Sequence, residues 1–339
     1  MTDLKSWMDA VKSRVDSRLE AYFSEKLKEA ASISPDSVEL VEGVQSLTLR
    51  GGKRFRPMMV EAGAGAVSPG SADSVVDAGA SLEVLQSYLL IHDDWMDQDD
   101  ERRGGPAVHA MYRGRYDLHM ANSLGILAGD LASTYSLELL TGGPFAAEQL
   151  GKGIQIFLQI QKEVLLGQHL DITAHPDVAK MHDLKTTSYT VRGPLLLGAA
   201  LAGASDAQNA ALTAYANPLG EAFQLADDLL GTFGDMATTG KPGNDVKNRK
   251  RTSLVGEAER LLAAGSRDSL DRVMAGEDKD GDIDAAVELL VSSGAKANIE
   301  QRLLKRADES KAALKGAPLD AAGIAILEGL ADRLALRAV

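Results

Sequence analysis

The sequence contains no cysteine among its 339 residues. Without thiols the chain can form neither disulfides nor cysteine-ligated zinc sites, and it has no cysteine nucleophile. Aromatic residues make up only 4% of the chain, whereas hydrophobic residues as a whole make up 45%. The core must therefore consist mainly of alanine, leucine, valine and isoleucine, a composition that suits helices packed on helices.

Long apolar runs and an excess of basic residues are also missing. No segment approaches the roughly 18 consecutive apolar residues of a membrane-spanning helix. The N-terminal segment alternates charged and apolar residues, unlike the apolar stretch of a signal peptide. The 36 basic residues stand against 49 acidic ones, which gives a net charge of −13. Such a chain is not drawn to nucleic acid or anionic membranes by charge, and we expect a cytoplasmic protein.

Apolar residues spaced three and four apart predict helices through almost the whole sequence. After a first helix that includes Leu4 and Phe23, the pattern recurs at 53–67, 72–97, 117–141, 145–170, 178–190, 206–233 and 294–337. Alternation with period two is nearly absent, so few or no strands are expected. No linker or change of composition divides the chain. We therefore predict an all-α fold, a single helical domain over residues 1–339 built as a large bundle with a central cavity.

The segment "IHDDWMDQDDERRGGPAVH" (91–109) places many carboxylates directly after an apolar helix. If that helix continues, Asp93 and Asp97 lie one turn apart on the same face. Carboxylates stacked in this way repel each other unless a cation lies between them. Oxygen ligands without cysteine favour Mg²⁺ or Mn²⁺. The alternative is a solvated helix end.

A second acidic segment, "FQLADDLLGTFGD" (223–235), favours the metal interpretation. Asp227 and Asp228 lie inside an apolar helix, where carboxylates cost several kcal/mol unless they are paired or metal-bound. Aspartates on separate helices can share ions in the core of a bundle. Mg²⁺ held by such acids typically serves a phosphate or diphosphate substrate, because it readily accepts phosphate oxygens as ligands.

Basic residues alternate with these acids along the chain. The stretch "RGGKRFRP" (50–57) combines two glycines, which let backbone amides approach an anion, with Lys53, Arg54 and Arg56. Further basic side chains are found at Arg102, Arg103, Lys185, Lys241, Lys247, Lys250 and Arg251. The alternation predicts a cavity with a metal-lined side and a Lys/Arg-lined side, suited to two anionic groups.

Taken together and in this order, six motifs resemble those of the trans-type isoprenyl diphosphate synthases, the polyprenyl synthetase family. They are "GGKRFRP", "DDWMDQDDERRGGPAVH", "GQHLD" (167–171), "KTTSY" (185–189), "FQLADDLLGTFGD" and "TGKPGND". The resemblance covers about residues 45–255 and is greatest to geranylgeranyl and farnesyl diphosphate synthases. One departure is Gly231, which stands where many relatives have a third aspartate.

The resemblance implies a Mg²⁺-dependent prenyltransferase of isoprenoid biosynthesis that joins isopentenyl diphosphate to an allylic diphosphate after the allylic substrate ionises. About three Mg²⁺ ions, with Mn²⁺ as the alternative, would neutralise the leaving group. The implied metal ligands are Asp93, Asp97 and Asp227, with Asp228 as an auxiliary ligand and no direct role for Asp235. The implied catalytic residues are Asp93, Asp94, Asp97, Asp227, Lys185, Thr186 and Gln224.

The same resemblance assigns the substrate-binding side chains to two substrates. The allylic diphosphate would be held by Arg102, Lys185, Lys241 and Lys250, and isopentenyl diphosphate by Lys53, Arg56, Gln86 and Arg103. The carbonyl of Thr186 and the amide of Gln224 would face the allylic cation, and the departing diphosphate would accept the proton. His92 and His109 are interpreted as structural, with His109 hydrogen-bonded to its loop.

Product length would be set on the 72–97 helix, where Tyr88 and Leu89 precede Asp93 by five and four residues. A bulky residue there closes the pocket, which predicts a C20 product, with C15 as the alternative. A longer-chain polyprenyl synthase and a non-catalytic partner subunit of a heteromeric synthase also remain open. A homodimer is expected from the family. The acidic stretch at 277–288 resembles a calcium loop but has the wrong spacing, so we expect a polar loop in which Asp284 begins a helix.

Overall fold

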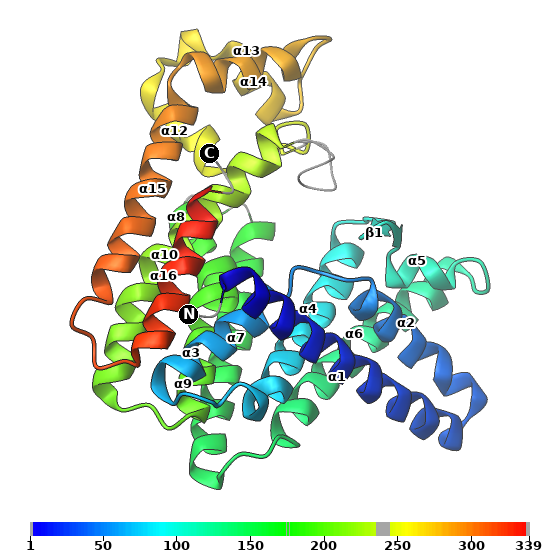
Figure 1. Ribbon diagram of the computed structural model, residues 1–339. Helices are drawn as coiled ribbons and strands as arrows, with labels where there is room; N and C mark the ends of the chain where they lie inside the picture. The colour runs from blue at the N-terminus through cyan, green and yellow to red at the C-terminus, as the bar shows by residue number, and fades with distance from the viewer. Residues whose placement is uncertain (1–2, 174, 176, 235–244, 337–339) are drawn as a thin grey trace. The chain divides into compact units, whose positions relative to one another are not determined.

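The computed structural model describes residues 3–173, 175, 177–234 and 245–336. The chain forms two compact units. Unit 1 comprises Met1–Phe157, Pro194–Ser205 and Asp320–Gly323, and unit 2 comprises Leu158–Gly193, Asp206–Leu319 and Ile324–Val339. Helices make up nearly all of the regular structure in both units, which confirms the all-α prediction (Figure 1). The assignment of residues 1–339 to one domain stays a prediction.

Unit 1 is built around the pair α4 and α6. Its helices are α1 (Leu4–Ile33), η1 (Pro35–Ser37), α2 (Val38–Leu49), α3 (Phe55–Val67), η2 (Asp73–Val75), α4 (Val76–Met96), α5 (Val108–Tyr112), α6 (Leu118–Thr141), the first part of α7 (Ala147–Ile172) and most of α9 (Gly193–Leu201). The buried face of α6 carries small residues, among them Gly125 and Gly129. A Cβ atom at Gly129 would lie 2.2 Å from Nε2 of His92 on α4. The two helices approach closely because this face has almost no side-chain bulk.

Unit 2 is organised around α10 (Asp206–Phe233), which runs beside α15 (Ala295–Ala313) and η3 (Asp183–Arg192). The unit also contains the second part of α7, α8 (Val178–His182), α12 (Ser253–Leu261), η4 (Ala264–Ser266), α13 (Asp268–Ala275), α14 (Asp282–Ser292) and most of α16 (Ala321–Leu336). Tyr215 of α10 is completely buried and donates a 2.6 Å hydrogen bond to the carbonyl of Leu327 in α16. This bond links the central helix of the unit to α16.

Several helix boundaries differ from the sequence pattern. The 294–337 pattern forms two helices, because α15 ends at Ala313 and Gly316 adopts a positive φ of 72° before α16 begins. The expectation that Asp284 begins a helix was wrong by two residues, since α14 begins at Asp282. The carboxylate of Asp282 accepts hydrogen bonds from the amide of Lys279 (2.8 Å) and from Nε of Arg272 (2.8 Å). These bonds hold the first turn of the helix, and residues 277–281 before it form the expected polar loop.

Strands are nearly absent, as predicted. Within the described ranges the only regular strands are β1 (Glu101–Arg102) and β2 (Gly105–Pro106), which pair antiparallel with Glu101 opposite Pro106 and Arg102 opposite Gly105. We call residues 101–106 the hairpin. No helix in the described part of the chain is both long and apolar enough to span a membrane.

Candidate active site

The first acidic segment in unit 1 divides its carboxylates between two sides of α4. The amide of Asp97 donates a 2.8 Å hydrogen bond to the carbonyl of Asp93, so the helical turn continues to Asp97 and the two residues share a face, as predicted. Asp93 is half-buried and Asp97 is exposed. Asp94, in contrast, has 0% of its surface exposed. The adjacent aspartates of the motif therefore occupy very different environments.

Asp94 binds an arginine of the hairpin. Its Oδ1 accepts a 2.6 Å hydrogen bond from Nε of Arg102 and is also ion-paired with Nη2 of the same guanidinium. Its Oδ2 is buried and has no hydrogen-bond partner among the described residues. Burial raises the pKa of Asp94, and the neighbouring guanidinium of Arg102 opposes that shift. Asp94 thus holds Arg102 in place, and its predicted catalytic role stays a prediction.

The glycine-containing loop before α3 lies next to the turn of the hairpin. Nη1 of Arg103 donates a 2.8 Å hydrogen bond to the carbonyl of Gly51, which brings together two of the basic segments identified in the sequence. Lys53 is exposed and Arg56 is half-buried. These two side chains and Arg103 thus belong to one region of unit 1, as their assignment to one diphosphate requires.

Arg54, which the sequence grouped with the anion-binding residues, is used inside the protein. Its side chain is 2% exposed and its backbone is left-handed, with φ of 51°. The guanidinium donates to Asp16 (2.7 Å) and Glu83 (2.6 Å), and also to the carbonyl of Thr48. Arg54 therefore fixes the start of α3 against α1 and α4, and its charge is compensated there.

The remaining predicted residues of unit 1 lie on α4 and α5. Gln86 and Leu89 are half-buried, and Tyr88 is buried with its ring edge-on to His92 at a centroid distance of 5.0 Å. Nε2 of His92 lies 3.1 Å from the carbonyl of Ile126, a structural contact. His109 is buried, and its Nε2 lies 3.5 Å from Oδ1 of Asp100 at the base of the hairpin. Burial lowers the pKa of His109. Both histidines thus have the structural contacts expected of them.

In unit 2, Lys185 and Thr186 lie on η3, a helix with the wider π-type turn. Two glycines allow this helix to fit between its neighbours. A Cβ atom at Gly167 of α7 would lie 2.5 Å from the amide nitrogen of Lys185, and one at Gly220 of α10 would lie 2.2 Å from Cγ2 of Thr187. Nζ of Lys185 forms a 2.5 Å ion pair with Asp171 of α7. The aspartate of "GQHLD" therefore anchors the lysine of "KTTSY". Helical π turns occur frequently at functional sites.

The second acidic segment repeats the division found in the first. Asp227 is exposed and Asp228 is 3% exposed. Asp228 accepts two 2.7 Å hydrogen bonds, at Oδ1 from Nε2 of Gln224 and at Oδ2 from the amide of Ser253. The second aspartate thus orients a predicted site residue and the first turn of α12. Burial, which outweighs these hydrogen bonds, raises the pKa of Asp228 to about 6.

Asp227 lies in an acidic environment although its side chain is accessible. The reduced hydration at the densely surrounded carboxyl group raises its pKa to about 6, and the carboxylates of Asp228 and Asp245 contribute to the shift. A divalent cation would relieve this concentration of negative charge, so the oxygen-only set fits Mg²⁺.

Sequence reasoning missed Asp245, the last residue of "TGKPGND". A Cβ atom at Gly231 would lie 2.0 Å from Oδ2 of Asp245, so that carboxylate occupies the space one turn beyond Asp227. Nζ of Lys250, a predicted clamp residue, lies 3.0 Å from Oδ1 of Asp245. The glycine in place of a third aspartate is thereby explained, because a carboxylate from a later loop fills its position. The predicted residues Lys241 and Asp235 lie outside the described residues.

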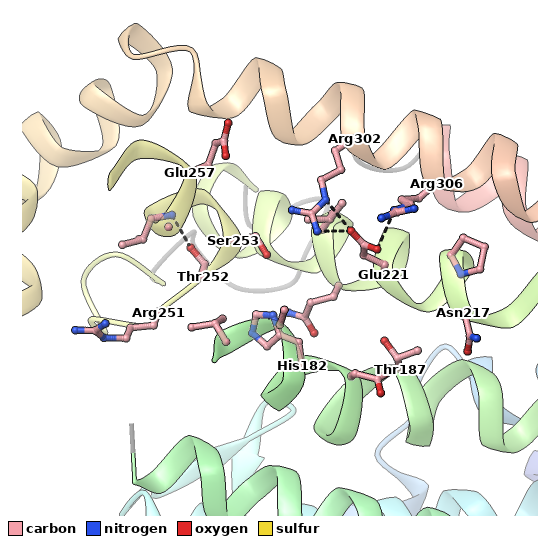
Figure 2. A pocket seen from close by; sticks show the side chains of 18 of the residues that line it. His182, Thr187, Asn217, Glu221, Arg251, Thr252, Ser253, Glu257, Arg302 and Arg306 are labelled. Atoms are coloured by element: carbon pink, nitrogen blue, oxygen red, sulfur yellow. Dashed lines mark hydrogen bonds and ion pairs between the residues drawn. The ribbon is translucent and has the colours of Figure 1, made fainter. Parts of the chain in front are cut away.

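A cavity of about 580 Å³ lies in unit 2 between α8 and η3 on one side and α10, α12 and α15 on the other (Figure 2). Gln224 and Thr187 line it, whereas Asp227, Lys185 and Lys250 do not. Glu221 bridges two arginines over the cavity, with Oε1 2.6 Å from Nε of Arg302 and Oε2 2.8 Å from Nε of Arg306. Arg306 also pairs with Glu309 at 2.6 Å, so two carboxylates compensate the two guanidiniums, and we assign this charged side of the cavity no part in the chemistry.

Comparison with known proteins decides the family. The model of the polyprenyl synthetase family matches residues 38–290. The chain belongs to the polyprenyl synthetase family. It is 31% identical over 265 residues to the short chain isoprenyl diphosphate synthase of Methanocaldococcus jannaschii, covering 75% of this chain and 77% of that one. It is 34% identical over 232 residues to the geranylgeranyl diphosphate synthase of Sulfolobus acidocaldarius, covering 66% and 68%.

Among solved structures, the geranylgeranyl pyrophosphate synthase of Corynebacterium glutamicum matches with a TM-score of 0.88 and 34% identity over 99% of both chains. That protein was crystallised with isoprenyl diphosphate and magnesium. The chain is therefore a short-chain isoprenyl diphosphate synthase with the all-α fold of these enzymes, a prenyltransferase whose substrates are isopentenyl diphosphate and an allylic diphosphate. Use of a divalent metal follows from its family.

Proposed function

We propose that this enzyme makes geranylgeranyl diphosphate (C20) and that Asp93, Asp97 and Asp227 bind Mg²⁺ on a shared diphosphate. The observation that carries the proposal is the repeated arrangement of the two Asp-Asp pairs. In each pair the first aspartate is more exposed than the second, and the second is buried and holds another predicted site residue, Arg102 or Gln224. A pattern needed only for solubility would not bury the second carboxylate in both segments.

The roles of the acids follow from what their oxygens contact. Both oxygens of Asp228 accept N–H bonds, so we propose that Asp228 acts through Gln224 and leaves metal binding to Asp227. Asp245 lies beside Asp227 and adds negative charge to the same metal site. When bound, Mg²⁺ would neutralise the negative charge that develops on the leaving diphosphate. The number of ions, about three, and the use of Mn²⁺ stay predictions.

The basic residues would bind and orient the two substrates. Lys185, held by Asp171, and Lys250, held by Asp245, together with Arg102 would bind the allylic diphosphate, with Lys241 as a further predicted ligand. Isopentenyl diphosphate would be bound by Lys53, Arg56, Gln86 and Arg103. Because both substrates are then held close together and oriented for reaction, the entropic part of the activation free energy is lowered.

The reaction then needs little further protein chemistry. The C–O bond of the allylic diphosphate breaks, and the electron pair leaves with the diphosphate. The double bond of isopentenyl diphosphate attacks the allylic cation, and a proton passes to the departed diphosphate. The carbonyl oxygens of Thr186 and Gln224 would place partial negative charge beside the cation. Asp228 would orient one of these carbonyl groups, because it accepts a hydrogen bond from the amide group of Gln224.

A product assay tests the proposed function directly. Purified protein is incubated with Mg²⁺, labelled isopentenyl diphosphate and a C5, C10 or C15 allylic primer, with EDTA controls, and the products are sized after dephosphorylation. We expect a C20 product that EDTA abolishes. Farnesyl diphosphate as the final product would support the C15 alternative. A lack of activity with every primer would favour a non-catalytic partner subunit and overturn the proposal.

Tyr88 provides a prediction on product length. It is buried on α4 five residues before Asp93, where its ring would close the end of the prenyl pocket. Tyr88→Ala is expected to shift the main product beyond C20, because removing the ring opens space for further isoprene units. Tyr88→Phe keeps the ring and serves as the control, with no expected shift. An unchanged product from Tyr88→Ala in the same sizing assay would refute the assignment.

A homodimer is proposed on the exposed side of α6. Met120 (47%) and Leu127 (52%) are exposed there, two turns apart on the same face, and Leu118 and Ile126 of the same helix are also exposed. An apolar surface of this kind favours contact with a second copy. Light scattering after size exclusion is expected to give the mass of two chains, and Leu127→Asp is expected to reduce it to one. A wild-type monomer would contradict this. The cytoplasmic location stays a prediction.

A further inference from the structure

We infer that Arg50, which directly precedes "GGKRFRP", is a positioning residue that holds the turn of the hairpin so that Arg103 can bind isopentenyl diphosphate. The inference rests on the proposed function of Arg103. Arg50 follows the last residue of α2, and its guanidinium reaches the hairpin. None of the predicted catalytic or substrate-binding roles includes it.

The guanidinium of Arg50 joins both strands of the hairpin to α2. Its Nη1 donates to the carbonyl of Arg102 in β1 (3.1 Å) and to that of Pro106 in β2 (2.6 Å). Its Nη2 donates to Oγ of Ser46 in α2 (2.9 Å). Each strand is only two residues long, and two-stranded hairpins are marginally stable on their own. The hairpin therefore depends on outside contacts, and Arg50 supplies bonds that bridge its two strands.

Gly105 makes this contact possible. A Cβ atom there would lie 2.8 Å from both Cζ and Nη1 of Arg50, closer than non-bonded atoms approach. The guanidinium thus lies directly against the backbone of β2. A side chain at position 105 would displace Arg50 from the hairpin without changing the charge of either residue, which separates position from charge.

The effect of Arg50 should be concentrated on one of the two arginines. Arg103 has a left-handed backbone, with φ of 53°, and its contacts to the carbonyls of Gly51 (2.8 Å) and Leu47 (3.4 Å) depend on where the turn lies. Arg102 has its own buried anchor in Asp94. Loosening the turn should therefore disturb the isopentenyl diphosphate subsite more than the allylic one.

The base of the hairpin does not depend on Arg50. The amide of Ala107 donates a 2.8 Å hydrogen bond to the carbonyl of Asp100, and the carboxylate of Asp100 pairs with Nη1 of Arg113 at 2.6 Å. These contacts hold together the two ends of the hairpin. Variants of Arg50 should consequently keep the fold and lose only the position of the turn.

The kinetic test compares Arg50→Ala, Arg50→Lys and Gly105→Ala with the control Arg115→Ala. Arg115 is an exposed arginine that pairs with Glu39 at 3.0 Å, so its removal changes the charge equally without affecting the hairpin. Arg50→Ala and Gly105→Ala are expected to raise KM for isopentenyl diphosphate about tenfold, with kcat and the allylic KM changed less than about twofold. Arg50→Lys should resemble Arg50→Ala, because an ammonium group cannot reproduce the planar arrangement of donors with which the guanidinium reaches both strands and Ser46. Normal KM in Gly105→Ala together with rescue by Arg50→Lys would overturn the inference in favour of a direct charge effect.

Proteolysis supplies a readout that does not depend on catalysis. Trypsin cuts after arginine, and the bond after Arg103 lies in the turn. Initial cleavage of the native full-length chain at this bond, followed by mass spectrometry, is expected to be about tenfold faster in Arg50→Ala and Gly105→Ala and unchanged in Arg115→Ala. Unchanged cleavage together with unchanged KM in an active enzyme would reject the role of Arg50. Faster cleavage in variants of a protein that makes no prenyl diphosphate would reject the proposed function, whereas the role of Arg50 in holding the hairpin would still stand.

Discussion

Replacing Asp227 with asparagine is expected to lower kcat for prenyl transfer by about a thousandfold or more, measured at saturating Mg²⁺ and saturating concentrations of both substrates. The amide is nearly the same size as the carboxylate but carries no charge, so the diphosphate would lose a metal ligand when its charge develops. Because the substitution removes one negative charge from an acidic cluster that raises the pKa of Asp227, the thermal unfolding midpoint of the metal-free enzyme should not fall.

Two variants on the same helix serve as comparisons for Asp227→Asn. Asp206→Asn removes an exposed carboxylate at the start of α10 and should leave kcat unchanged. Asp228→Asn weakens the bonds that hold Gln224 and Ser253, so it should lower kcat less, by about ten- to a hundredfold, and also lower stability. An Asp227→Asn enzyme that keeps more than about a tenth of wild-type kcat would contradict the assignment of Asp227 to the metal.

Asp94→Ala is expected to lower the free energy of unfolding by about 3 kcal/mol, measured by urea denaturation. Asp94 is fully buried and the side chain of Arg102 is only 17% exposed, so the substitution leaves an arginine largely desolvated without its partner. The released Arg102 should also weaken binding of the allylic diphosphate, as a raised KM for that substrate.

Asp99→Ala is the matched control for Asp94→Ala. Asp99 also pairs with Arg102, but at 3.5 Å and with a side chain that is 57% exposed. Its removal should cost no more than about 0.5 kcal/mol, since exposed ion pairs contribute little. If Asp94 bound metal instead of Arg102, Asp94→Ala would weaken the dependence on Mg²⁺ and leave stability unchanged.

The long helices could be predicted from sequence because their apolar spacing is continuous over several turns. This holds for α6, α7 and α10, whose bounds differ from the predicted ranges by no more than two residues. The π-type turns of η3 could not be predicted, since they depend on close contacts with Gly167 and Gly220 in two other helices. The short helices α12 and α13 lie in a stretch of the sequence for which no helix was predicted.

The chemistry could be predicted from motifs, whereas the different roles of neighbouring residues within each motif could not. Asp93 and Asp94 are adjacent and chemically identical, and only the hairpin that follows shows which one receives Arg102. Arg54 resembles its basic neighbours in the sequence, yet its partners Asp16 and Glu83 come from distant segments. Asp245 left a signal that could have been used, because Gly231 marks the position that its carboxylate fills.

A crystal structure of the enzyme with Mg²⁺, isopentenyl diphosphate and a non-reactive allylic diphosphate analogue would test the central claim most directly. The proposal predicts Mg²⁺ ions at about 2.1 Å from carboxylate oxygens of Asp93, Asp97 and Asp227, all coordinated to the same allylic diphosphate. It is contradicted if ions bound by Asp93 and Asp97 contact a diphosphate that no ion held by Asp227 touches.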